Sequence, residues 1–204
     1  MRRPLAKRVL DVVVSATLLL LLSPVVLAVL VAFALDVVLE REDRGSLFYR
    51  EPRISRGRTF GLLKFRTLRA DAVLRAGGHA RLLEADPANL TWLGRRVLKP
   101  WYLDEIPQLW NILRGDLSLV GPRPWPPELV EQQRAEGVTY RDEVSAGLTG
   151  LAQLTKGSDQ RYADLDIAYV ERCRTLAGWA LVRYDLGIVL RTVRVVARGE
   201  GLSY

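Results

Sequence analysis

The residue pair with the clearest chemical potential is Asp104 followed by Glu105. Apolar side chains recur at helical spacing just behind the pair, so the sequence predicts a helix over residues 104–113 that begins at Asp104. Because the first turn of a helix attracts negative charge, we expect a carboxylate held there to stay ionised at neutral pH. Such a carboxylate can attack phosphorus, and its neighbour can bind Mg²⁺ or move a proton. Adjacent acids commonly do no more than cap a helix, and that interpretation stays open.

Two further motifs present cations that suit phosphate. Lys64 and Arg66 flank Phe65, so they share one face of a predicted strand and could clamp a phosphate. In the Pro-Arg-Pro motif of residues 122–124, two rigid prolines present Arg123 to a phosphate or a planar base. Taken alone, each motif also fits an ordinary alternative, a basic strand face or a stiff surface loop.

Composition excludes several classes of protein. The single cysteine, Cys173, excludes an internal disulfide and a cysteine-based zinc site, and the single histidine, His79, excludes a multi-histidine metal site. Chemistry must therefore rest on carboxylates, hydroxyls, Lys and Arg. The 30 Lys and Arg against 23 Asp and Glu give a net charge of +7, which suits nucleotides, nucleic acid or anionic lipid head groups.

The longest apolar segment lies near the N-terminus. Residues 12–35 carry no charged side chain, and about 20 apolar residues are enough for a membrane helix. Both flanks are basic, and basic flanks prefer the cytosolic side of a membrane. A helix that enters and leaves by the same face satisfies both flanks, and Pro24 breaks the segment near its centre. We therefore expect a re-entrant, broken helix in residues 1–36, rather than a signal peptide or a straight span, and a cytosolic domain in residues 37–204.

The remaining pattern predicts an α+β fold that is mostly helical and membrane-associated. Strands over residues 47–50 and 59–65, with a turn at residues 55–58, predict a β-hairpin. The last predicted helix has apolar residues along one side with Arg residues among them, so it is either an ordinary packed helix or a helix on the membrane surface. The predicted helices cover residues 67–83, interrupted by glycines 77 and 78, then 104–113, 126–136 and 167–196.

In this order, the motifs resemble those of bacterial sugar transferases, in the small form of the monotopic polyprenyl-phosphate phosphoglycosyl transferase family. The stretch from Asp104 to Pro124 carries the most specific part of the resemblance. The matching segments are residues 7–11, 23–24, 64–68, 103–111, 115–124, 147–153 and 166–170.

The resemblance implies an enzyme that moves a phosphosugar from a UDP-sugar to undecaprenyl phosphate and releases UMP. It implies Mg²⁺ as cofactor, a covalent aspartyl-phosphosugar intermediate, and the first membrane step of glycan assembly. It also implies a place at the bacterial inner membrane, among membrane lipid, with the catalytic domain on the cytosolic face. A homodimer is compatible with the family, and no nucleic acid partner is expected.

The resemblance also implies roles for single residues. Asp104 is the expected nucleophile, with Glu105 as its partner for Mg²⁺ or for protons. Lys64 and Arg66 are expected to hold phosphates, and Arg123 to contact the nucleotide. Asp166 is a further expected site carboxylate.

One departure concerns Lys99, which stands where the family usually has Arg. Lys cannot make the bidentate phosphate contact of Arg. Donor binding at Lys99 is therefore expected to be weaker, or Arg95 or Arg96 takes over that contact.

A non-catalytic protein that binds anionic lipid or nucleic acid through its Arg-rich surface is the alternative function. The intact Asp-Glu pair and Pro-Arg-Pro motif argue against it, because a non-catalytic relative would have no need of them.

Overall fold

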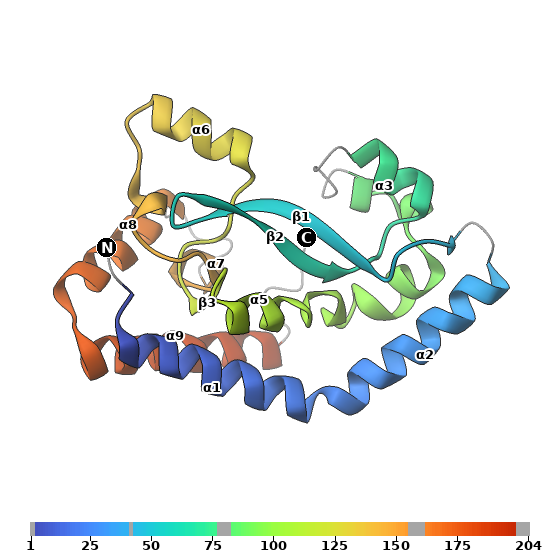
Figure 1. The fold of residues 1–204 in the computed structure, drawn as a ribbon, viewed down its shortest axis with the longest axis horizontal. Coiled ribbons are helices and arrows are strands. Elements are labelled where there is room, and N and C mark those ends of the chain that lie inside the picture. Colours follow the sequence, from blue (N-terminus) through green and yellow to red (C-terminus); the bar gives the residue numbers. More distant parts are fainter. Residues whose placement is uncertain (1–2, 41–42, 77–82, 155–161, 199–204) are drawn as a thin grey trace. The chain divides into compact units, whose positions relative to one another are not determined.

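The computed structural model describes residues 3–40, 43–76, 83–154 and 162–198 (Figure 1). His79 and the predicted break at glycines 77 and 78 lie outside these ranges. The chain forms two compact units. Unit 1 comprises Met1–Ser15, Arg53–Phe60 and Asn111–Tyr204, and unit 2 comprises Ala16–Pro52 and Gly61–Trp110. The boundary predicted at residue 36, between membrane helix and cytosolic domain, stays a prediction.

The N-terminal segment forms two helices with a sharp bend between them. Helix α1 (Leu5–Leu21) and helix α2 (Ser23–Leu39) are bent by 56° at the break (Figure 1). Pro24 lies in the first turn of α2, and the Ser23 hydroxyl donates to the Leu20 carbonyl at 2.7 Å. Within the described residues, no single helix is long and apolar enough to cross a membrane. Helices α1 and α2 taken together have the length and the composition to do so.

The first turns of α1 bind other parts of unit 1 through charged side chains. The Lys7 ammonium pairs with Asp185 and donates to the Val120 carbonyl at 3.0 Å. Asp11 is fully buried and accepts a 2.9 Å hydrogen bond from the Leu119 amide. Lys7 and Asp11 lie four residues apart on one face of α1, so protein rather than lipid covers that face.

Unit 1 contains a short parallel sheet and the C-terminal helices. Strand β3 (Ser118–Val120) pairs with β4 (Gly147–Thr149). A Cβ at Gly147 would lie 2.1 Å from the Gly121 amide nitrogen, so glycine is required where these loops meet. The helices of this unit are α6 (Pro127–Ala135), α7 (Leu151–Leu154), α8 (Tyr162–Thr175), α9 (Gly178–Ala197) and a 3-10 turn (Tyr140–Asp142).

The single helix predicted over residues 167–196 is wrong in one respect. The structure has two helices there, because α8 ends at Thr175 and α9 starts at Gly178. Gly178 has φ of +52°, a left-handed conformation that glycine adopts without strain. Apolar periodicity continues across this break, and for that reason it did not reveal the break.

The predicted β-hairpin is confirmed, with longer strands than the sequence indicated. Strands β1 (Phe48–Ser55) and β2 (Arg58–Phe65) are joined by a two-residue turn at Arg56 and Gly57. Both turn residues have positive φ, at 52° and 72°, as a tight hairpin turn of this length requires.

Unit 2 also contains a small helical core around Leu68, Ala72 and Leu90. Its helices are α3 (Ala70–Ala76), a 3-10 turn (Pro87–Asn89), a π-helical turn (Gly94–Leu98) and a second 3-10 turn (Leu103–Glu105). Helix α5 (Gln108–Arg114) begins in this unit and ends in unit 1.

Candidate active site

The Asp104-Glu105 pair lies on a single 3-10 turn, Leu103–Glu105, and not on an α-helix. Helix α5 starts only at Gln108, after Pro107, so the predicted helix start at Asp104 is wrong. Tyr102 directly precedes this 3-10 turn and has φ of 54°, a left-handed conformation that turns the chain sharply before the pair. Asp104 is buried, with 6% of its surface exposed.

Burial decides the protonation of Asp104. It raises the pKa of the carboxyl group to about 7, and the nearby charge of Glu105 adds to this effect. Lys64 and Lys99 oppose the rise without cancelling it. With this pKa, roughly half of the Asp104 carboxyl groups are ionised at neutral pH, rather than nearly all of them as the sequence predicted. One 3-10 turn provides little helix dipole, and the cost of burying charge outweighs it.

Lys64 places a positive charge among four carboxylates of unit 2. Its ammonium group lies 3.4 Å from the carboxylate of Glu51, on the neighbouring strand. Burial lowers the pKa of Lys64, but the attraction of the surrounding carboxylates outweighs it, so the net pKa is raised and Lys64 stays charged. The carboxylates that act on it are those of Glu51, Glu105, Glu84 and Asp104.

Lys99 is held by Glu84. Its ammonium group lies 2.7 Å from a carboxylate oxygen of Glu84, and the Thr67 hydroxyl donates to the other oxygen at 3.1 Å. Burial raises the pKa of Glu84, but the two lysines and the Thr67 hydroxyl lower it by more. The net pKa is therefore lowered, and Glu84 stays ionised. Arg95 and Arg96 are exposed on the π-helical turn. Lys99 is thus the cation from this segment that acts on Asp104.

We call these six residues the dyad cluster: Glu51, Lys64, Glu84, Lys99, Asp104 and Glu105. Four carboxyl groups and two ammonium groups leave the cluster short of positive charge. In the described part of the chain, no three carboxylate, histidine or cysteine side chains are arranged to hold a metal ion. Mg²⁺ in phosphate-transferring sites is commonly held by one or two carboxylates and completed by substrate phosphates, and the cluster fits that arrangement.

Arg66 is buried, and its guanidinium group bonds to backbone carbonyls. Its Nε donates to Ser46 O at 2.7 Å and its Nη1 to Leu68 O at 2.7 Å. Its Nη2 donates to Asp43 O. Arg66 also lies just after the end of β2 and not within it. These bonds favour a structural role for Arg66 over the predicted phosphate clamp with Lys64.

Arg123 and Asp166 belong to unit 1. The Arg123 side chain is exposed, and its carbonyl accepts a 2.6 Å hydrogen bond from Arg141. The same Arg141 forms a buried ion pair with Asp166 at 2.8 Å and stacks 4.3 Å from the centre of the Trp125 ring. Asp166 therefore positions Arg141, and Arg141 holds the Pro-Arg-Pro loop. The direct substrate contact predicted for Asp166 stays a prediction that this geometry does not favour.

The comparisons with known proteins cover nearly the whole chain. The sequence profile of the family described as bacterial sugar transferase matches residues 2–199. The chain belongs to this family. The family resemblance drawn from the motifs is thereby confirmed, because the matched range includes every one of them.

Four curated relatives are 31–38% identical to this chain. The exopolysaccharide production protein ExoY of Rhizobium meliloti is 36% identical over 97% of this chain and 88% of its own length. The UDP-glucose:undecaprenyl-phosphate glucose-1-phosphate transferase of Caulobacter vibrioides is 38% identical over 93% of this chain and 68% of its own. The undecaprenyl-phosphate galactose phosphotransferase of Salmonella typhimurium is 31% identical over 96% of this chain. This chain spans only about two fifths of that protein and of an uncharacterized sugar transferase of Haemophilus influenzae.

The sequence did not predict that Glu51 and Glu84 belong to the dyad cluster. Glu51 had a usable signal, because it stands on the strand paired with the one that carries Lys64 in the predicted hairpin. Glu84 had none, since it lies outside every motif and reaches the cluster only through the tertiary fold.

A pair of substitutions at Asp166 tests its role in this transferase. Asp166→Asn keeps an oxygen that accepts from Arg141, so we expect most of the activity to remain. Asp166→Ala leaves Arg141 buried without its partner, and we expect a loss of about 3 kcal/mol of stability, measured by thermal unfolding in detergent. Arg174→Ala is the control, because its ion pair with Glu143 is largely exposed and therefore contributes little to stability. Inactive but stable Asp166→Asn protein would show that the Asp166 charge itself takes part in the reaction.

Proposed function

We propose that this chain transfers a phosphosugar from a UDP-sugar to undecaprenyl phosphate, with release of UMP, as the first membrane step of glycan assembly. The observation that carries the proposal is the buried Asp104, with its neighbour Glu105 and two nearby lysines, in a member of the bacterial sugar transferase family. The name of the Caulobacter relative supports the same donor and acceptor classes, and the name of the Salmonella relative supports the acceptor class.

In the proposed mechanism, an oxygen of the Asp104 carboxylate attacks the sugar-bearing phosphorus of the donor. The bond between that phosphorus and the bridging oxygen breaks, and UMP leaves with the electron pair. A phosphate oxygen of undecaprenyl phosphate then attacks the same phosphorus and frees the Asp104 carboxylate. Two successive displacements let a water-soluble donor and a lipid acceptor use one nucleophile in turn.

The remaining dyad-cluster residues have supporting roles in this mechanism. Lys64 and Lys99 balance the charge of the phosphate groups, and Glu51 and Glu84 hold the two lysines in place. Glu105 would hold Mg²⁺, with the donor phosphates completing its ligands. Bound Mg²⁺ supplies charge stabilisation to the transferring phosphoryl group.

An assay of UMP release decides between this function and the alternative. Purified full-length protein is incubated with Mg²⁺, undecaprenyl phosphate and each of a panel of UDP-sugars. We expect one or a few UDP-sugars to yield UMP together with a lipid-linked product. If no donor yields UMP while the protein still binds anionic vesicles, the non-catalytic membrane-surface protein becomes the better account.

We further propose that the bent α1–α2 pair is re-entrant and that the folded units lie on the cytosolic face of the bacterial inner membrane. The start of α1 is tied to unit 1 through Lys7, and near the end of α2 the ring of Phe33 lies 5.6 Å from Arg66 in unit 2. The two units are joined through the strands of the hairpin, and open strands with polar edges do not occur in lipid. Both ends of the helix pair therefore belong on one side of the membrane.

Exposed apolar side chains of unit 1 support contact with lipid. Leu5, Val9 and Val13 recur every four residues on the exposed face of α1. Helix α9 buries Leu181, Val182 and Ile188 on one side and exposes other apolar side chains. The exposed ones are Trp179, Leu186, Leu190 and Val193. Of the two alternatives for this helix, this distribution favours a helix on the membrane surface, with Trp179 suited to the head-group level.

Cysteine labelling in intact cells tests the topology. In a Cys173→Ala background, single cysteines replace Leu5, which is 79% exposed, or Leu74, which is 85% exposed. We expect both to be protected from a membrane-impermeant reagent outside the inner membrane and to react after the membrane is dissolved in detergent. Pro24→Leu restores a backbone donor at the bend and should shift part of the population to a full span, which exposes only the Leu5→Cys end. Periplasmic labelling at Leu5→Cys in the protein with Pro24 intact contradicts the re-entrant arrangement.

A further inference from the structure

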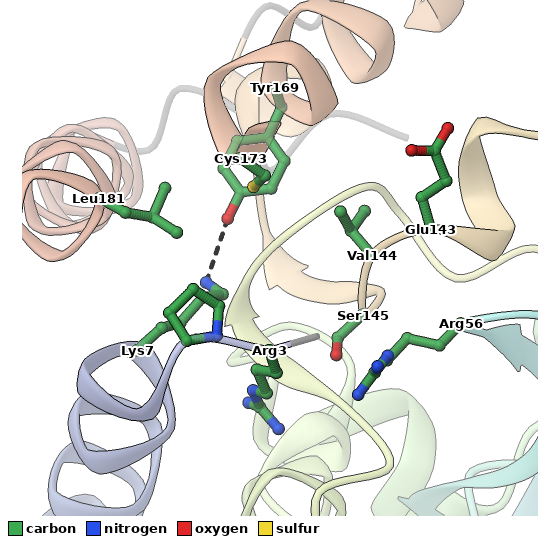
Figure 2. Close-up of a pocket in the computed structure, with 10 residues that line it drawn as sticks. Arg3, Lys7, Arg56, Glu143, Val144, Ser145, Tyr169, Cys173 and Leu181 are labelled. Carbon is green, nitrogen blue, oxygen red and sulfur yellow. Dashed lines mark hydrogen bonds between the residues drawn. The ribbon is translucent and has the colours of Figure 1, made fainter. Parts of the chain in front are cut away.

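Unit 1 contains a group of cationic side chains, none of which belongs to the dyad cluster. These cations line a small cavity that is open to solvent (Figure 2). Arg3 and Lys7 come from the N-terminal segment and Arg56 from the hairpin turn, and Figure 2 shows the Arg56 side chain running toward Arg3 and Ser145. The other lining residues are Pro4, Glu143, Val144, Tyr169, Cys173 and Leu181.

Two buried polar groups on the wall of this cavity have no hydrogen-bond partner. They are the Nε of Arg3 and the hydroxyl oxygen of Ser145, a residue that is only 5% exposed. The Nη2 of Arg3 is occupied by the carboxylate of Asp11 and lies 3.4 Å from the Leu117 carbonyl. The guanidinium group is therefore fixed with its Nε donor unsatisfied. Buried polar groups in folded proteins are nearly always hydrogen-bonded, and a bound ion or water can supply the missing partner.

The charge around the cavity favours an anion. Lys7 is paired with Asp185 and Arg3 with Asp11, and one carboxylate, Glu143, lines the wall. Both oxygens of Glu143 are bound by the guanidinium group of Arg174, so Glu143 adds little negative charge to the cavity. The wall thus carries the guanidinium groups of Arg3 and Arg56 together with the unsatisfied hydroxyl of Ser145. Phosphate groups suit such a wall, because they offer several acceptor oxygens to guanidinium and hydroxyl donors.

We propose that this cavity binds a phosphate group through Arg3, Arg56 and Ser145, none of which belongs to the dyad cluster. The phosphate belongs either to the head group of an anionic lipid or to a free phosphate species. The lipid source has a structural basis, since Pro4 on the cavity wall directly precedes Leu5, the first of the exposed apolar residues of α1.

Two variants separate this site from general electrostatic attraction. Ser145→Ala removes a hydroxyl that has no partner in the structure, so the ligand-free variant should melt at or above the wild-type temperature. Arg56→Gln removes a cation from the cavity wall. Arg58→Gln is the matched control, because it removes the same charge two residues away on the exposed start of β2 and does not line the cavity.

The experiment measures the unfolding temperature of the full chain in two arms. In the first arm, inorganic phosphate is titrated at constant ionic strength into protein in neutral detergent. In the second arm, the protein is placed in nanodiscs of phosphatidylcholine with or without phosphatidylglycerol. In at least one arm we expect stabilisation of the wild type and of Arg58→Gln, with about tenfold weaker apparent affinity for Arg56→Gln and Ser145→Ala.

The arms identify the source of the phosphate. Stabilisation by phosphatidylglycerol alone assigns the site to a lipid head group, and stabilisation by inorganic phosphate assigns it to a free species. Phosphate bound only at the dyad cluster would stabilise Ser145→Ala and wild type equally. The proposal is overturned if Ser145→Ala and Arg56→Gln respond like Arg58→Gln in both arms.

Discussion

Asp104→Asn is expected to stop UMP release completely, both with and without undecaprenyl phosphate. The substitution keeps the shape of the side chain and removes the nucleophilic oxygen charge on which the first displacement depends. We do not expect unfolding of the variant to be the cause of this loss of activity. Burial raises the pKa of Asp104 from 3.8 to about 7, so the protonated form stabilises the fold and this contribution is lost as the pH rises through about 7. At pH 8 the neutral Asn variant should therefore melt at or above the wild-type temperature.

Intact-protein mass spectrometry provides the direct measurement. With donor and Mg²⁺ but no acceptor, wild-type protein should gain the mass of one phosphosugar, and Asp104→Asn should not. Glu105→Gln is the companion variant, because it should impair turnover but can retain some adduct if its role is in proton handling. An adduct that persists in Asp104→Asn, or kinetics that require both substrates to be bound before UMP leaves, would show that Asp104 is not the nucleophile.

The second large effect is expected at Lys7, far from the dyad cluster in the sequence. Lys7→Met leaves Asp185 fully buried without its cation, and the Tyr169 hydroxyl loses a neighbour 3.1 Å away. Breaking a buried ion pair by removing one partner costs about 3–5 kcal/mol. For a chain of this size, that is a fall of roughly 10 °C in the unfolding temperature, measured in detergent.

The double variant Lys7→Met/Asp185→Leu is the control for this prediction. It replaces both charges by apolar groups, so it should recover much of the stability that the single variant loses. Lys7→Met protein that melts with the wild type would mean that the pair does not anchor α1 in unit 1.

The features that the sequence predicted correctly are those set by local residues. The bend at Pro24 follows from the missing backbone donor of proline, and the hairpin follows from alternation around a turn with Gly57. The site features that the sequence did not indicate depend on burial. Nothing in the local pattern indicates that Asp104 is desolvated, or that the guanidinium group of Arg66 donates to backbone carbonyls.

The break before α9 shows a different limit. Apolar residues continue through residues 167–196 with helical spacing, since α8 and α9 each bury one side. Only the conformation of Gly178 marks the break, and a glycine in sequence is compatible with several conformations. Glu84 likewise joins the dyad cluster through tertiary contacts that no motif announces.

The bend between α1 and α2 has a consequence for the bilayer itself. A straight helix takes up area in both leaflets, whereas a proposed re-entrant pair bent by 56° pushes lipids apart mainly in the leaflet through which it enters. Each inserted copy therefore expands one leaflet relative to the other, and the resulting curvature stress depends on lipid shape rather than on bilayer thickness. Cone-shaped lipids, which relieve such stress, should change how readily the protein inserts, while lengthening the acyl chains should have little effect.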